Sequence, residues 1–197
     1  MSTEGSWRII GQVVAANIAS FSAGSELHQT PPLGSLVEVD GSLPIYAVVC
    51  DARTESIEGR RPLAHLPVEA DLESFLAANP HLRHLLRSTF DAAVVGHGPD
   101  QVGGIRHYLP PAPAPIFAPV RLCSHEEVAR FTQSLDFLKP LLSAATNSDE
   151  AAAACLRLVS VTHADRRAFL VRAGKELARL LASEPDRLAA ILRRIRP

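Results

Sequence analysis

Residues 35–53 read SLVEVDGSLPIYAVVCDAR and contain two strand-like runs around a tight turn. In residues 35–40 apolar and polar side chains alternate, and residues 43–53 form the most strand-like run of the chain. The Asp40-Gly41 pair between them is a turn signal, because both residue types tolerate the backbone angles of a short hairpin loop. We therefore expect an antiparallel hairpin over residues 35–53.

Outward from this hairpin, other short runs rich in β-branched residues lie between turn-forming stretches. They cover residues 8–16, 18–26, 90–97 and 105–109. Between the two halves of this set, leucines and phenylalanine recur at helical spacing over residues 69–88. About six short strands joined by turns favour a closed β-barrel over an open sheet. The sequence thus predicts an antiparallel barrel with a short helical insertion.

Residues 110–119 read PPAPAPIFAP, and their five prolines predict a stiff, extended segment that ends the barrel. After it the apolar residues recur at helical spacing. The stretch Ser124-His-Glu-Glu127 has the form of a capping box. We expect four helices, over residues 124–142, 147–161, 162–181 and 185–195, which suffice for a small bundle. The fold class is α+β, with a barrel domain at 1–119 and a helical domain at 120–197.

Charge is distributed unevenly along the chain. Net charge is −1 over 197 residues, but residues 156–197 carry +6 and the rest carries −7. Such an asymmetry indicates either a surface that meets an oppositely charged partner or a solvated arginine-rich helix face. Both interpretations stay open at the level of sequence.

The three cysteines, Cys50, Cys123 and Cys155, are widely spaced and form no C-x₂-C pair. This pattern is typical of reduced thiols in a cytoplasmic protein. The first residues lack the basic and apolar regions of a signal peptide, and no apolar run approaches the roughly 20 residues that cross a bilayer. We expect a cytoplasmic protein without contact to a membrane.

Three stretches in this order resemble the HAS barrel, the domain shared by HerA-type translocases and ATP synthase catalytic subunits. They are IGQVV at residues 10–14, PPLGSLV at 31–37 and IYAVVCDAR at 45–53. The resemblance covers roughly residues 7–127. It implies that neighbouring barrels contact one another side by side, and that the proline-rich exit leads toward an ATPase domain.

The chain departs from such ATPases after the barrel. A phosphate-binding loop needs several glycines, a lysine and a hydroxyl in the pattern G-x₄-G-K-[S/T]. Past residue 119 the sequence has one glycine, Gly174, followed by Lys175-Glu176. We expect no ATP hydrolysis by this polypeptide and no cofactor.

Other candidate chemistry is sparse. His97 lies between two glycines, where it is either a ligand-facing imidazole or a tolerated turn residue. Cys123 and His125 straddle an expected helix start, so their side chains should point apart rather than pair. His81 and His84 are one helical turn apart, beside Arg83, which favours a solvated polar face. The spacing of cysteines and histidines matches no zinc site, and we expect a non-enzymatic protein without a metal.

Two segments are the candidate interface residues. One is the turn Pro31, Pro32, Leu33 and Gly34, and the other is the loop that begins at Arg53 and contains Arg60 and Arg61. The first also sets the register of the strand that follows it. The expected function is assembly or adaptation, in which the barrel mediates oligomerisation or docking to a HerA-type ATPase.

The alternative is a nucleic-acid-binding module that uses the barrel face and a basic tail of Arg193, Arg194 and Arg196. The last 42 residues contain a single aromatic side chain, Phe169, which leaves little to stack on bases. Arginines at the end of a helix also suit its dipole without any ligand.

Overall fold

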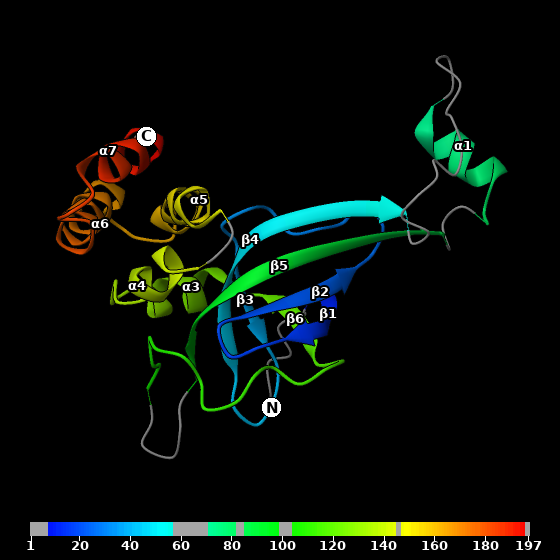
Figure 1. Ribbon diagram of the computed structural model, residues 1–197, viewed down its shortest axis with the longest axis horizontal. Coiled ribbons are helices and arrows are strands. Elements are labelled where there is room, and N and C mark those ends of the chain that lie inside the picture. The colour runs from blue at the N-terminus through cyan, green and yellow to red at the C-terminus, as the bar shows by residue number, and fades with distance from the viewer. Residues whose placement is uncertain (1–7, 57–70, 82–84, 99–103, 145–146, 196–197) are drawn as a thin grey trace.

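Six strands close into an antiparallel β-barrel in the first two thirds of the chain (Figure 1). The structure, a computed structural model, describes residues 8–56, 71–81, 85–98, 104–144 and 147–195. Around the barrel the strand order is β1-β2-β5-β4-β3-β6. The strands are β1 Ile9–Ala16, β2 Ser20–Ser25, β3 Leu36–Val39, β4 Ile45–Ser56, β5 Leu86–His97 and β6 Pro119–Leu122. The predicted barrel and the α+β class are confirmed.

The hairpin predicted from residues 35–53 forms as β3 and β4, with Val39 opposite Ile45. The central strands β4 and β5 are buried on both faces over much of their length. Alternate residues of β4 such as Ala47 point into the barrel, and the others, such as Val48, point outward under the helices. This double burial explains why residues 45–50 read as an uninterrupted apolar run.

The strand predicted at residues 105–109 is wrong. Among the described residues this segment contributes one isolated bridge, between Arg106 and His97. Pro110 follows directly, and a proline cannot donate to a ladder. The sixth strand is β6 instead, which pairs with both β1 and β3 and so closes the barrel. Its proline is the first residue of the strand, where no ladder bond is lost.

The helical insertion predicted over residues 69–88 is wrong at its C-terminal end. Helix α1 covers Leu72–Ala78 and is capped by the Asp71 carboxylate. Residues 86–88, expected to be helical, instead open β5, where Leu86 pairs with Ser56 of the extended β4. The strand predicted over residues 90–97 therefore began four residues too late, and the strand predicted over residues 43–53 ended three residues too early.

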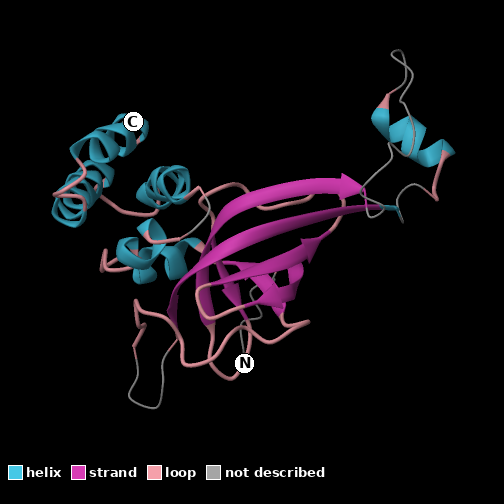
Figure 2. Cartoon of the chain, viewed as in Figure 1, coloured by secondary structure: helices cyan, strands magenta, loops and turns pink. Residues whose placement is uncertain are grey.

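Five helices follow β6 in the described part of the chain (Figures 1 and 2). They are α3 His125–Phe131, α4 Leu138–Leu142, α5 Ser148–Ser160, α6 Arg166–Leu180 and α7 Pro185–Arg194. The capping box of Ser124 and Glu127 is confirmed. The single helix expected over 124–142 is wrong, because Pro140 could not donate to Asp136 within it. In α4 this proline lies in the first turn, where no such bond is required.

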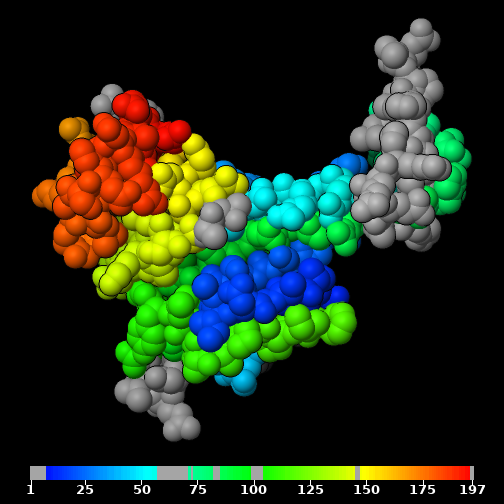
Figure 3. Space-filling view, in the orientation of Figure 1, coloured from blue at the N-terminus to red at the C-terminus, as the bar shows by residue number. Residues whose placement is uncertain are grey.

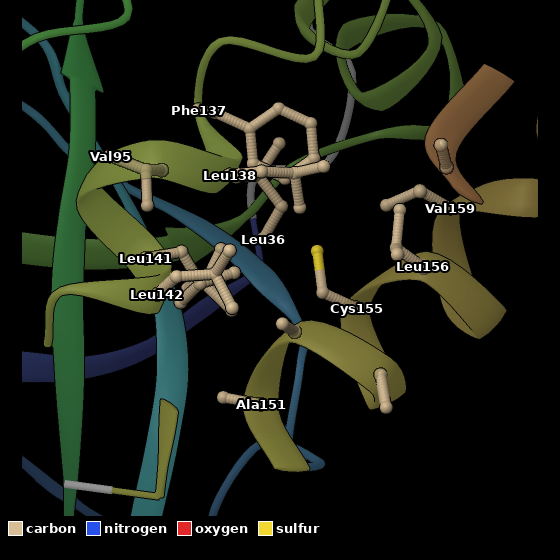
Figure 4. Close-up of a cluster of buried hydrophobic side chains, with 14 of the residues drawn as sticks. Leu36, Val95, Phe137, Leu138, Leu141, Leu142, Ala151, Cys155, Leu156 and Val159 are labelled. Carbon is tan, nitrogen blue, oxygen red and sulfur yellow. The ribbon is translucent and has the colours of Figure 1, made fainter. Parts of the chain in front are cut away.

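The helices pack on the outer surface of the barrel. Figure 4 shows Leu36 of β3 and Val95 of β5 facing the helical side chains Phe137, Leu138, Leu141, Leu142 and Cys155. A second cluster, with Phe90 and Val13 among its members, fills the barrel itself. The expected boundary between residues 119 and 120 falls inside β6, so the barrel extends to Leu122. Within the described residues no helix is both long and apolar enough to cross a membrane.

Candidate interaction surfaces

Arg121 links the barrel to the first helix after it. Its guanidinium donates to Glu38 Oε2 of β3 at 2.7 Å and to both carboxylate oxygens of Glu127 in α3 at 2.8 Å. Arg121 and Glu38 are buried. The Glu127 carboxylate also accepts the Ser124 backbone N–H at 2.7 Å. One arginine therefore bridges two carboxylates across the junction of the two parts of the chain.

The carboxylates of this cluster are shifted in opposite directions. The hydrogen bonds from Arg121, reinforced by Ser124, lower the pKa of Glu127 to about 2. Burial raises the pKa of Glu38 above its ordinary value and outweighs the attraction of Arg121. Burial acts to lower the pKa of Arg121, but the hydrogen bonds to Glu127 and the charge of Glu38 outweigh it and raise this pKa. These hydrogen bonds of the Arg121 guanidinium join β3 and α3 through side chains of the chain itself.

The turn Pro31–Gly34 contacts the chain's own helix α5. Pro31 and Gly34 are buried, whereas Pro32 and Leu33 are exposed. Gly34 adopts φ 83°, and a Cβ placed there would lie 2.4 Å from the backbone nitrogen of Cys155. Half of this candidate interface is thus already used inside the molecule, which leaves Pro32 and Leu33 for an external contact.

Arg53 lies on the part of β4 that extends past the helices. Its guanidinium forms ion pairs with Asp51, at 3.3 Å, and with Asp91 of β5. Its side chain is about half exposed. Arg60 and Arg61, the other members of that prediction, lie outside the described residues.

The basic tail is partly neutralised by the rest of the helical domain. Arg194 pairs with Glu150 of α5 at 2.8 Å, and its carbonyl accepts a hydrogen bond from Arg157. Arg187, two helical turns earlier, pairs with Asp149 at 2.7 Å. Arg193 is exposed, and Arg196 lies outside the described residues. These contacts favour the interpretation of the tail as a helix surface rather than a nucleic-acid site.

The candidate nucleophiles are poorly activated. Burial raises the pKa of Cys50 to about 11 and that of Cys155 to about 12, and it also raises the pKa of Cys123. A nucleophilic thiol requires the opposite shift. His97 is buried, with its Nδ1 3.1 Å from the Gly98 carbonyl and its ring edge-on to Tyr108. The described residues contain no group of three or more His, Cys, Asp or Glu side chains placed to hold a metal.

The sequence did not predict the exposure of three apolar side chains on β1 and the proline-rich segment, Val14, Ile116 and Phe117, which we call the Phe117 surface. Phe117 is 74% exposed, Val14 51% and Ile116 48%. The Phe117 N–H donates to the Val13 carbonyl at 2.8 Å, which ties the proline-rich segment to β1. Figure 3 shows this segment beside the β1–β2 surface, away from the helices. Two large apolar residues inside a proline-rich run were the available signal.

Phe117 also has an uncommon backbone conformation, with φ 67°. For a bulky side chain this left-handed region is unfavourable, by about 1–2 kcal/mol. A glycine would adopt it without strain and would expose no ring. The surrounding hydrogen bonds hold the strained conformation in place, since Val13 donates to the Ala118 carbonyl at 3.0 Å. In the isolated chain, both the exposure of the Phe117 ring and the strain of its backbone therefore cost free energy.

No model of a known protein family matches this chain, and no curated protein matches it. The HAS-barrel resemblance accordingly stays a prediction from the residues that carry it.

Proposed function

We propose that this chain is an assembly or adaptor protein that acts through protein contacts of its barrel rather than through catalysis. The observation that carries the proposal is the Phe117 surface, meaning Val14, Ile116 and Phe117. An exposed aromatic side chain on a strained backbone is typical of a residue retained for binding. Burial of its ring in a partner's pocket would recover the free energy that exposure costs the isolated chain.

The arrangement of the helices supports this proposal. They cover the outer faces of β3, β4 and β5, and this contact buries Leu36, Tyr46 and Val48. In the described part of the chain, no helix packs extensively on β1 or β2 (Figure 1). A barrel with one side sealed by its own chain retains the other for a second protein.

The partner that the sequence indicates is a HerA-type ATPase. If the HAS-barrel resemblance holds, barrels of this kind associate with one another, and this chain would add a barrel without adding a motor. The raised pKa values of its cysteine thiols are consistent with a role that involves no nucleophile.

The test is a calorimetric titration of the purified full-length chain with a purified HerA-type ATPase from the same cell. The mass of the chain alone is measured in parallel by light scattering after gel filtration. Saturable binding to the ATPase supports the proposal. A chain that is strictly monomeric and binds no such ATPase would contradict it.

A further inference from the structure

Among the described residues, the part of β4 beyond Cys50 has a strand partner on one edge and none on the other. The upstream half of β4 is paired on this second edge: Val49 exchanges hydrogen bonds with Gly34 and Ser35, at 2.8 and 3.0 Å. The next carbonyl, that of Cys50, accepts from the Asn147 side chain at 3.2 Å. Beyond Cys50 the described residues provide β4 with a strand partner on the β5 side alone. Ala52, Arg53 and Thr54 are all exposed.

The backbone of Thr54 faces this open edge. The Ala52 N–H donates to the Asp51 carboxylate at 3.0 Å rather than to β5. On the far side of β5, the carbonyl of Ser88, the residue opposite Thr54, accepts from Ser25 of β2. Because successive residues of a strand direct their N–H and C=O groups to opposite edges, Ala52 and Thr54 direct theirs away from β5. An edge of this kind is a template for another strand.

We infer that this edge binds the same edge of a second copy of the chain, through an antiparallel β4–β4 pair centred on Thr54. The inference rests on the proposed function, in which the barrel acts through protein contacts, and it names a second partner and surface for it. About a two-fold axis at Thr54, the two Thr54 residues face each other as a hydrogen-bonded pair and exchange both N–H···O=C bonds.

Charge complementarity argues for a second copy as the occupant. In this register Arg53 of each copy lies opposite Glu55 of the other, in a non-hydrogen-bonded pair where side chains approach most closely. Symmetry makes the attractive pair occur twice. Within one chain Glu55 already contacts Arg87 of β5 at 2.5 Å, so the dimer would extend an existing row of alternating charges across the interface.

Neighbouring registers fit less well. An axis at Arg53 or at Glu55 would set identical charges directly opposite one another. An axis at Ala52 would place Arg53 opposite Asp51, but it would require the edge of Cys50, which Asn147 occupies. The Thr54 register is the one that uses the open part of the edge and pairs opposite charges.

Cysteine cross-linking tests the register directly in the full-length chain. Cα atoms of a hydrogen-bonded antiparallel pair are about 5.5 Å apart, within disulfide range. Thr54→Cys should therefore form a disulfide-linked dimer under mild oxidation. Glu55→Cys is the matched control, because the two residues would be offset by two positions along the strands, which places their Cα atoms about 8 Å apart, beyond disulfide range. Equal cross-linking of the two variants, or of the wild type, would overturn the inference.

Charge reversal provides a second test, with light scattering as the readout. Arg53→Glu and Glu55→Arg should each weaken dimerisation by about tenfold or more, since each creates two like-charge pairs. The double variant should restore the dimer. Within a single chain, the double variant should be electrostatically the least favourable of the three. A Glu at position 53 would lie near Asp51 and Asp91, and an Arg at position 55 would lie near Arg87. A double variant weaker than either single one would overturn the inference.

The outcomes separate this inference from the proposed function. A wild-type chain that stays monomeric at the highest soluble concentration overturns the β4–β4 dimer. Binding to the ATPase would then still support the proposed function. Conversely, a dimer that obeys the Thr54 register without any binding to the ATPase supports the inference and removes the proposed ATPase partner.

Discussion

Arg121 forms two largely buried ion pairs that link the barrel to the first helix after it. Its removal would leave the Glu38 carboxylate buried without a counter-charge, which is more costly than the loss of an exposed ion pair. We expect Arg121→Met to lower the free energy of unfolding by about 3–5 kcal/mol. The measurement is urea denaturation followed by circular dichroism.

Arg87→Met serves as the matched control for this prediction. Arg87 also pairs with a glutamate, Glu55, but both side chains are substantially exposed. Its replacement should change stability by less than about 1 kcal/mol. Similar losses for the two arginines would show that the buried cluster has no special role.

Gly34 combines two constraints that can be separated by substitution. Gly34→Ala should cost more than about 2 kcal/mol, because a methyl group would face both positive φ and the α5 backbone. Gly104→Ala shares the positive φ, at 98°, but meets nothing within 4 Å and should cost about 1–2 kcal/mol. Gly41→Ala, whose nearest neighbour is 3.9 Å away, should be close to neutral. Thermal denaturation of the three variants checks this order, and an equal loss at Gly34 and Gly104 would exclude the contact with α5.

The cluster of Arg121, Glu38 and Glu127 should also make the stability of the protein sensitive to acid. The folded pKa of Glu127, about 2, lies below its ordinary value of 4.5, so its ionised form stabilises the fold above about pH 5. This stabilisation is lost as pH falls from about 5 toward 2. Glu38 has the opposite sign, because its raised pKa means that ionisation costs stability as pH rises.

Urea midpoints between pH 6 and pH 3 measure the effect. We expect Glu127→Gln to show a smaller drop in midpoint over this range than the wild type. Glu126→Gln, an exposed neighbour on the same first turn, should behave like the wild type. A wild-type slope retained in Glu127→Gln would place the acid sensitivity elsewhere.

At the level of secondary-structure elements, those whose signals lie within a short stretch of sequence could be predicted. The strand that closes the barrel could not. The hairpin over residues 35–53 has both its alternation and its turn within a short stretch, and the capping box of α3 lies within four residues. Strand β6 has four residues, beginning with a proline, and exists because β1 and β3 pair with it from far away in the sequence. No local pattern distinguishes it from the end of a proline-rich linker.

The candidate surfaces follow the same division. The exposure of Phe117 depends on hydrogen bonds to Val13, about a hundred residues earlier, and Gly34 is buried by a helix that begins at residue 148. Neither relation is visible in a local window. The sequence did identify Gly34 as a special position, although for an external contact rather than an internal one.

Strand β6 yields a prediction about truncation. A chain ending at residue 119, the boundary that the sequence suggested, would lack β6 and expose the outer faces of β3, β4 and β5. We expect this fragment to be unfolded or aggregated by circular dichroism and proton NMR. A fragment with dispersed amide signals would show that the barrel needs neither its sixth strand nor the helices.

For the molecule as a whole, one side of the barrel contacts the chain's own helices, and other parts of it do not. The helices pack on one side of the barrel, and two basic side chains of α7, Arg187 and Arg194, form ion pairs with acids of α5. Within the described residues, the helices do not pack on the Phe117 surface or on the β4 edge beyond Cys50. If both proposals hold, the protein would contact two partners through separate parts of one barrel.

The central claim is that the Phe117 surface binds another protein, and the most direct test is the affinity of Phe117→Ser for a HerA-type ATPase. Val161→Ser is the matched control, because Val161 is also apolar and 60% exposed but lies on the helical side. Calorimetry should show a loss of tenfold or more in affinity, about 1.4 kcal/mol or above, for the first variant and no change for the second. Equal affinities for wild type and Phe117→Ser would contradict the account.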